Sequence, residues 1–409
     1  MKKVMILGAG VYQVPLIKQA QKQGFYTIVV SRPGNYPGFD IADKHYNLDT
    51  TDEEAVLKAA RLEQIDGIAT AGTDVAVRTL GRVCQELHLC GLPYTSALKV
   101  TDKYLMKQSF ADGGVSSAKF CKVDSLAQAF DVFHKMTADG AKAVMIKAVD
   151  SSGSRGVTKV TTAQEVEHAY LEARSVTHRP YVLVEEFVEG HEIGVDGFIC
   201  NGKITLLLPH EKFVLKNSGT TIPAGHGFPY LCSSKQQEEI RQQMELAIRA
   251  LGLDNCAFNS DVLIGDKVSI LEIGGRSGAT GIPELISLYC GFSYYEKILE
   301  NALGITPDFT FGQQTPCMSR LLFSPIRGTI TDICFEELES IKKEGIALSL
   351  DYGIGDTIPV VHNGTDRIGQ FLLKSSSTEL LTNICHRIYS SIYVDGTSLK
   401  EYWDARKSA

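Results

Sequence analysis

The stretch that decides the fold is VMIKAVDSSGSRGV, residues 144–157, in which an apolar run ends at Lys147 and a loop of small residues follows. The apolar run predicts a buried strand, and residues 156–160 predict its antiparallel partner. A lysine at such a strand end and a small-residue loop bring one cation and several backbone N–H groups to the same place. We interpret this as a phosphate cradle, although it lacks the Gly-Lys-Ser/Thr of a P-loop. The alternative is a flexible hairpin tip with a solvated Arg155.

A second informative stretch, VLVEEFVEGHE, covers residues 182–192. It predicts a strand that ends in acids and continues into a short apolar link. Such a strand end can offer a carboxylate and backbone groups to the edge of an adenine, and Glu192 could accept hydrogen bonds from ribose hydroxyls. Taken alone, the stretch is better explained as an ordinary strand end with solvated glutamates.

A third stretch is a predicted hairpin over residues 259–273 with Gly265-Asp266 as its turn. A turn at that place puts Asp261 and Glu272 near each other on neighbouring strands. Two carboxylates held close together repel each other unless a cation lies between them, and carboxylate oxygens are suitable ligands for Mg²⁺. The hairpin therefore predicts a metal site, with an exposed acidic hairpin as the competing interpretation.

The first hundred residues alternate between strand and helix patterns. We expect strands at 3–7, 27–30 and 67–70 and helices at 14–23, 53–63 and 74–87, which together indicate an open parallel α/β sheet. The first turn, GAGVYQ at residues 8–13, is similar to a dinucleotide-binding turn. However, Gln13 stands where helix packing usually requires Gly or Ala, and Ser31-Arg32 replace the acid that binds a ribose. A βα turn without a nucleotide is favoured, and an NADP-dependent oxidoreductase is kept as an alternative.

The rest of the chain changes to strand pairs with interspersed helices, which is typical of α+β construction. A helix begins at Thr101-Asp102-Lys103, where Thr or Asp can act as the N-cap, and ends at Gly113-Gly114. The last hundred residues predict a smaller α+β module with strands at 319–323 and 328–333 and a helix around 379–389. The expected domains are 1–100, 101–306 and 307–409, with joints near Pro93 and Pro307.

Composition excludes several classes of protein. The chain has 409 residues and a formal net charge of −7 at pH 7, which argues against nucleic acid as a partner. Its ten cysteines form no CxxC pair and are expected to be reduced thiols. No signal peptide or apolar run of about 20 residues is present in the sequence, so we expect no membrane span and a cytoplasmic location.

In this order the motifs resemble the ATP-grasp superfamily, and the resemblance covers roughly residues 1–305. It implies a pre-ATP-grasp α/β domain, an ATP-grasp domain and a small C-terminal α+β domain, with ATP and Mg²⁺ or Mn²⁺ as cofactors. Asp261 and Glu272 resemble the metal-binding acids. The positions that resemble nucleotide-binding residues are the first lysine Lys103, the second lysine Lys147, the loop residues Ser152, Gly153, Ser154, Arg155 and Gly156, the adenine-hinge residues Glu185, Glu186 and Val188, and the ribose acid Glu192.

Within the superfamily the chain is most similar to carboxylate–amine ligases of the L-amino-acid ligase type. That resemblance implies that Arg276 helps to hold the reacting phosphoryl and acyl groups and that Lys212 is a further phosphate-side lysine. It also implies that His226 and Gly278 contact the substrate. Many relatives have Asn where this chain has Gly274, and some have an acid where it has Pro223.

The resemblance predicts an ATP-dependent ligase that converts a small carboxylate, such as an amino acid, to an acyl phosphate and couples it to an amine. The expected partners are therefore small molecules, with no nucleic acid or membrane, and a homodimer is a possible assembly. The alternatives are a carboxylase or carbamoyl-phosphate-type enzyme that uses bicarbonate, and a non-catalytic ATP-binding protein.

Overall fold

The computed structural model describes residues 1–153, 155–217, 220–343, 347–362, 366–375 and 377–408. The chain forms two compact units. The first consists of residues 1–209, 231–279 and 293–309, and the second of residues 210–230, 280–292 and 310–409. The three domains expected from the sequence, with their two boundaries, stay predictions.

The first unit opens with a parallel sheet in the order β3-β2-β1-β4. Its central strands are buried throughout residues 4–7 and 28–30, as a parallel sheet covered by helices requires. The predicted open parallel sheet is confirmed, but the last predicted helix begins at Val77 because residues 74–76 form a bend and turn. The elements are β1 (Lys3–Leu7), α1 (Val14–Lys22), β2 (Tyr26–Ser31), α2 (Pro37–Ile41), β3 (Lys44–Asn47), α3 (Glu53–Glu63), β4 (Gly67–Ala69), α4 (Val77–Leu87) and α5 (Tyr94–Val100).

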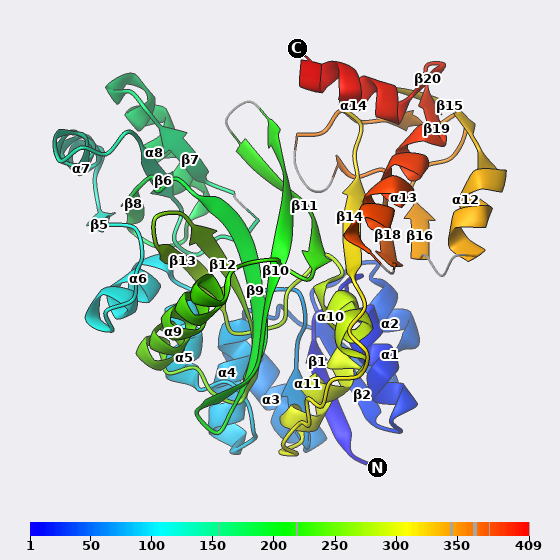
Figure 1. Ribbon diagram of the computed structural model, residues 1–409. Helices are drawn as coiled ribbons and strands as arrows, with labels where there is room; N and C mark the ends of the chain where they lie inside the picture. The colour runs from blue at the N-terminus through cyan, green and yellow to red at the C-terminus, as the bar shows by residue number, and fades with distance from the viewer. Residues whose placement is uncertain (154, 218–219, 344–346, 363–365, 376, 409) are drawn as a thin grey trace. The chain divides into compact units, whose positions relative to one another are not determined.

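A second sheet of the same unit is antiparallel, in the order β5-β8-β6-β7, and α7 and α8 cover it (Figure 1). Apolar side chains from the strands and from both helices form one buried cluster between them, so the sheet has its own core. The predicted pairing of residues 144–147 with 157–160 is confirmed. The strands and helices are β5 (Phe120–Val123), α7 (Leu126–Ala138), β6 (Val144–Lys147), β7 (Val157–Val160), α8 (Ala163–Val176) and β8 (Val182–Glu186).

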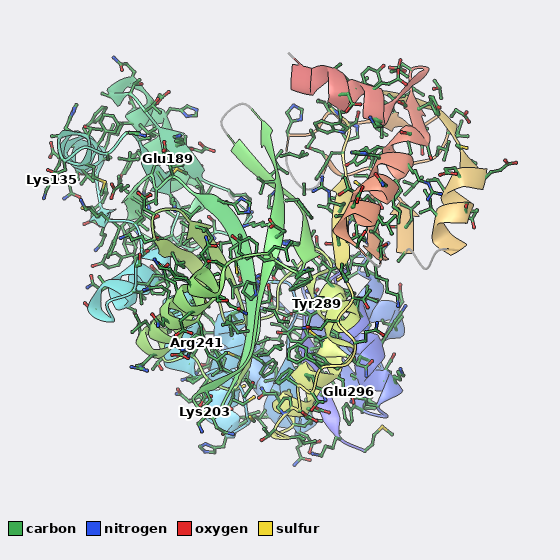
Figure 2. The ribbon with its side chains drawn as sticks, in the orientation of Figure 1. Lys135, Glu189, Lys203, Arg241, Tyr289 and Glu296 are labelled. Carbon is green, nitrogen blue, oxygen red and sulfur yellow. The ribbon has the colours of Figure 1, made fainter. Side chains whose placement is uncertain are left out.

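The remaining strands of the first unit run in the order β13-β12-β9-β10. The predicted hairpin is confirmed, and its register places Asp261 opposite Glu272. The solvent side of α9 carries charged residues such as Arg241, which is labelled in Figure 2. Within the helix Arg241 bonds to Glu238 and Glu245. The elements are α6 (Lys103–Asp112), β9 (His191–Cys200), β10 (Lys203–Asn217), α9 (Ser234–Leu251), β12 (Cys256–Ile264), β13 (Val268–Gly274) and α11 (Tyr294–Ala302).

The second unit contains the end of β10, whose residues 211–217 pair with β11. The predicted elements near 319–323, 328–333 and 379–389 are confirmed as β14, β15 and α13, and they share a buried apolar core. Tyr289 of α10, which is labelled in Figure 2, stacks on Phe228 of β11. The elements are β11 (Thr220–Phe228), α10 (Ile282–Cys290), β14 (Cys317–Leu322), β15 (Gly328–Ile333), α12 (Phe335–Lys343), β16 (Ala347–Leu350), β17 (Thr357–Ile358), β18 (Gly369–Lys374), α13 (Thr378–Ser390), β19 (Ile392–Val394), β20 (Thr397–Ser398) and α14 (Leu399–Ser408).

None of the helices in the described part of the chain combines the length and the apolar character that crossing a membrane would require.

Candidate functional site

The N-terminus of α6 is held by Asp102, one of the two residues predicted as its cap. One carboxylate oxygen accepts hydrogen bonds from two backbone N–H groups of the first turn, at 3.0 and 3.3 Å. The other accepts from the hydroxyl of Tyr181 at 2.7 Å and lies 3.3 Å from the Nε of Arg179. These contacts fix the direction of the helix at its first residue, Lys103, which is a predicted nucleotide-binding lysine.

We expect Asp102→Ala to lower the free energy of unfolding by about 2 kcal/mol, because it removes the cap and leaves the partners of a buried carboxylate unpaired. Asp102→Asn keeps a capping oxygen and should lose about half as much. Urea denaturation of both variants measures the difference. An alanine variant as stable as the wild type would show that Asp102 does not fix this helix.

Lys103 connects the small-residue loop to the metal hairpin. Its Nζ donates a hydrogen bond to the carbonyl oxygen of Ser151 at 2.8 Å and lies 3.5 Å from a carboxylate oxygen of Glu272. Burial acts to lower the pKa of Lys103, but the carboxylates of Glu272 and Asp74 outweigh it and raise that pKa above its ordinary value. Lys103 is therefore a firmly charged cation between two predicted ligand-binding segments.

Glu185 lies between two lysines. Its Oε2 is 2.6 Å from the Nζ of Lys147, on the neighbouring strand, and its Oε1 is 3.7 Å from the Nζ of Lys107. Burial acts to raise the pKa of Glu185, but the two ammonium groups outweigh it and lower that pKa, so the carboxylate is ionised. The buried Oε1 accepts no hydrogen bond in the structure, since 3.7 Å is too long for one.

Lys107 is a site residue that the sequence analysis missed. It lies one helical turn after Lys103, and its side chain is only 2% exposed. The signal that could have found it is the spacing of four residues, which places two lysines on the same side of a helix.

The small-residue loop is held by internal hydrogen bonds. The hydroxyl of Ser151 donates to the carbonyl oxygen of Arg155 at 2.7 Å, and the Nε of Arg155 donates to the carbonyl oxygen of Ser152 at 3.3 Å. Gly153 and Gly156 have φ angles of 68° and 65°, in the left-handed region that favours glycine. The predicted loop residue Ser154 lies outside the described residues.

The predicted hinge follows β8. The backbone N–H of Glu186 donates to the carbonyl oxygen of Lys119 at 2.9 Å, and Val188 is half-buried in the irregular segment that comes next. Glu192 is the second residue of β9 and lies opposite Leu263 of β12. The structure therefore places Glu192 on the strand that neighbours the strand of Asp261.

The predicted metal acids, Asp261 and Glu272, lie opposite each other in the register of β12 and β13. The Glu272 side chain is 46% exposed, so a ligand can reach it from solvent. In the part of the chain that the structure describes, no group of three or more histidine, cysteine or acidic side chains could hold a metal by itself. A metal held by this pair needs further ligands from substrate or water.

Arg276 lies in a network of partly buried groups. Its Nη2 donates to Asp74 at 2.8 Å, and its Nη1 donates to Asn259 and to the carbonyl oxygen of Ser277, both at 3.1 Å. Burial acts to lower the pKa of Arg276, but Asp74 outweighs it and raises that pKa further. The Nε of Arg276 is buried without a hydrogen-bond partner.

Gly274 makes room for this network. A Cβ atom at position 274 would lie 3.1 Å from Oδ1 of Asp74 and 3.5 Å from Cζ of Arg276. An Asn here would therefore crowd the ion pair between Asp74 and Arg276. The predicted substrate residue Gly278 lies nearby in the same network, where its N–H donates to the buried Asp196 at 3.1 Å.

The GAGVYQ turn is filled by its own glutamine. Gln13 is buried, its Oε1 accepts from the N–H of Gly10 at 3.0 Å, and its Nε2 donates to the carbonyl oxygen of Ala71 at 2.5 Å. The side chain that breaks the glycine fingerprint thus occupies a backbone donor that a pyrophosphate would need.

Lys212 and His226 belong to the second unit, where they lie opposite each other in the register of β10 and β11. His226 is 6% exposed, and its Nδ1 has no hydrogen-bond partner. Burial, with contributions from His210 and Lys212, lowers the pKa of His226 well below its usual range, so its ring is neutral.

Comparison with known proteins identifies the class to which this fold and site belong. Residues 141–283 match the ATP-grasp domain family. That segment contains the small-residue loop, the Lys147–Glu185 pair, the metal acids and Arg276.

Three similar proteins extend the match. A formate-dependent phosphoribosylglycinamide formyltransferase of Methanocaldococcus jannaschii is 25% identical over 308 residues, 70% of this chain and 72% of its own. An alanine–anticapsin ligase of Bacillus subtilis is 23% identical over 261 residues, 58% of this chain and 54% of its own. The crystal structure of an L-amino acid ligase from Bacillus licheniformis superposes with a TM-score of 0.78 at 18% identity, covering 96% of this chain and 98% of that one.

The chain therefore contains an ATP-grasp domain and has the ATP-grasp fold, as the sequence predicts. It is an enzyme of the ADP-forming ATP-grasp ligase family, and the formyltransferase and the alanine ligase are its distant homologues. Enzymes of this family use ATP and Mg²⁺.

Proposed function

We propose that this enzyme uses MgATP to activate a small carboxylate as an acyl phosphate and couples it to an amine, releasing ADP and phosphate. The observation that carries the proposal is the position of Lys103, which contacts both the small-residue loop and Glu272. A cation between a phosphate cradle and a metal acid is suited to the charge of a nucleotide triphosphate.

The residues present fit ATP. The buried Oε1 of Glu185 is an ionised acceptor that lacks a hydrogen bond, and the exocyclic amine of adenine is a donor that could satisfy it. The neighbouring Lys147 ends the strand that leads into the small-residue loop, so a single segment offers a cation and backbone N–H groups to phosphates. Glu186, Val188 and Glu192 are proposed to bind the rest of the nucleoside.

The residues present also fit a magnesium ion. Asp261 and Glu272 offer hard oxygen ligands from adjacent strands, and Mg²⁺ typically takes one or two protein carboxylates and completes its shell with water and substrate phosphates. When bound there, the ion would neutralise phosphate charge during phosphoryl transfer.

The proposed reaction has two steps. In the first, a carboxylate oxygen of the substrate attacks the γ-phosphorus of ATP, the bond to the bridging oxygen breaks, and ADP leaves. In the second, the amine nitrogen attacks the acyl carbon, the carbon–oxygen bond to phosphate breaks, and the nitrogen loses a proton. ATP is needed because a carboxylate oxygen is a poor leaving group in water, whereas phosphate is a good one.

The protein contributes positioning and charge. Lys103 and Lys147 would counter the phosphate charge, and Arg276 would face the negative charge that develops on the acyl group. Closure of the loop at residues 151–156 would keep water from the acyl phosphate. The roles of Lys212, His226 and Gly278, a homodimer and a cytoplasmic location stay predictions.

The substrate class is supported by the relatives. The names of the formyltransferase and of the alanine ligase specify formate and alanine, both of which are small carboxylates. We propose an amino acid or a related small acid as the activated substrate of this enzyme.

The test is an assay of ADP and phosphate release with MgATP and a panel of small carboxylates and amines. We expect release to depend on both partners and mass spectrometry to find a product equal to their sum minus one water. Release driven by bicarbonate alone would favour a carboxylase instead. Binding of ATP without turnover across a broad panel would favour a non-catalytic ATP-binding protein.

A further inference from the structure

Lys107 connects the two strands that carry opposite ends of the proposed nucleotide site. Its Nζ donates a hydrogen bond to the hydroxyl of Ser117 at 2.6 Å, and that hydroxyl donates to the carbonyl oxygen of Ile270 at 2.9 Å. Ile270 lies two residues before the metal acid Glu272 on β13. On its other side, the Lys107 ammonium lies 3.7 Å from Oε1 of Glu185 on β8.

We propose that Lys107 is a positioning residue for MgATP: through Glu185 and Ser117 it fixes the strand of the adenine acceptor relative to the strand of the metal acid. The inference rests on the proposed function, because it assigns a role in binding the same nucleotide. The ammonium of Lys107 is directed to Ser117 and Glu185, so it acts on the nucleotide through these two residues and not as a direct phosphate ligand.

The contacts of Lys107 explain why a charged residue is kept in this buried place. The ammonium of Lys107 donates a hydrogen bond to Ser117 and makes an ionic contact with Glu185 on β8. Its position is therefore fixed by both residues. The longer distance to Glu185 leaves Oε1 without a hydrogen bond while keeping it charged. An acceptor held in this state is ionised and has no hydrogen-bond donor of its own among the described residues.

The charge balance also distinguishes Lys107 from a residue that only stabilises the fold. Glu185 already has Lys147 at 2.6 Å, so removal of Lys107 leaves a neutral pair and no uncompensated acid. Methionine is close to lysine in length and shape, so Lys107→Met should fold. Loss of nucleotide affinity without loss of stability is therefore the expected signature.

Titration gives a second signature. The charged groups that act on Lys107 are Glu185 on β8, Lys147 on β6 and Glu272 on β13. Burial and, to a smaller extent, Lys147 lower the pKa of Lys107 to about 8, although both acids oppose the shift. Lys107 is thus protonated below that pH and loses its charge above it, whereas an arginine in its place would stay charged.

The experiment measures the Kd of the non-hydrolysable analogue AMP-PNP with Mg²⁺ by calorimetry between about pH 7 and about pH 9.5. We expect wild-type affinity to fall as the pH rises through about 8, because Lys107 becomes neutral. Lys107→Met should bind about tenfold more weakly at pH 7 and lose the pH dependence. Lys107→Arg should also lose it but keep the affinity of the low-pH wild type. Thermal unfolding should show no loss of stability in Lys107→Met.

Two further variants serve as controls. Ser117→Ala keeps the charge and breaks the link to β13, so it should weaken binding at every pH and retain the pH dependence. Lys135→Met removes an exposed lysine of α7 and should change nothing (Figure 2). If Lys107→Met binds the nucleotide with wild-type affinity, or loses enough stability to account for its weaker binding, the positioning role of Lys107 is wrong. The proposed function would not be affected by either result. A wild type that does not bind the nucleotide would overturn the proposed function as well.

Discussion

Glu272→Gln is expected to reduce kcat of the proposed ligase by about 1000-fold while leaving the fold intact. Glutamine keeps the size of the side chain but removes the charge that a metal ligand opposite Asp261 must supply. It also removes the acid that lies 3.5 Å from Lys103, so two interactions with the nucleotide site change together. The measurement is ADP release at saturating substrates, with the Mg²⁺ concentration varied.

The matched control is Asp266→Asn. Asp266 lies at the exposed tip of the same hairpin, in the turn between β12 and β13, so this variant removes an acid from the same element without touching the site. Its activity and Mg²⁺ dependence should match the wild type. Because the Glu272 side chain is 46% exposed, neither substitution should lower the unfolding temperature appreciably. A Glu272→Gln enzyme that turns over normally would disprove the metal assignment.

Much of this site could be predicted because its parts are local in sequence. The closeness of Asp261 and Glu272 follows from a short turn between two adjacent strands, and a register shift between Asp261 and Val262 then places the two acids opposite each other. Lys147 likewise ends a strand whose partner begins ten residues later, after the loop that both strands flank. Patterns of this kind are contained in a single window of the chain.

Two features were not predictable because they depend on contacts between distant segments. Asp74 and Arg276 are separated by 202 residues, and nothing near either one identifies the other as its partner. Judged from the neighbouring sequence, Gly274 is a position that lacks a metal-binding side chain. In the structure, the absence of a side chain at Gly274 leaves room for the ion pair between Asp74 and Arg276. The spacing of Lys107 from Lys103 places both lysines on one side of α6, but the burial of Lys107 depends on its contacts with Glu185 and Ser117, which are distant in sequence or outside the helix.

Arg276→Lys is expected to lower kcat/KM for the carboxylate substrate by about 100-fold or more and to leave nucleotide affinity nearly unchanged. The guanidinium bonds at once to Asp74, to Asn259 and to the carbonyl oxygen of Ser277. A lysine has one nitrogen and cannot make these contacts in the same plane, so the charge is retained and its direction is lost. Initial rates at varied carboxylate concentration separate this effect from a change in binding of AMP-PNP.

Asp74→Asn tests whether direction or charge is what Arg276 supplies. The amide oxygen of asparagine can still accept the Nη2 hydrogen bond seen at 2.8 Å, but it no longer neutralises the guanidinium. If Asp74 serves to orient Arg276, this variant should lose far less activity than Arg276→Lys, and combining both should cost less than the sum of the two effects. Arg241→Lys, on the exposed face of α9, controls for the substitution itself. Full activity in Arg276→Lys would mean that a positive charge suffices at this position. It would contradict the proposal that an oriented guanidinium contacts the reacting acyl group.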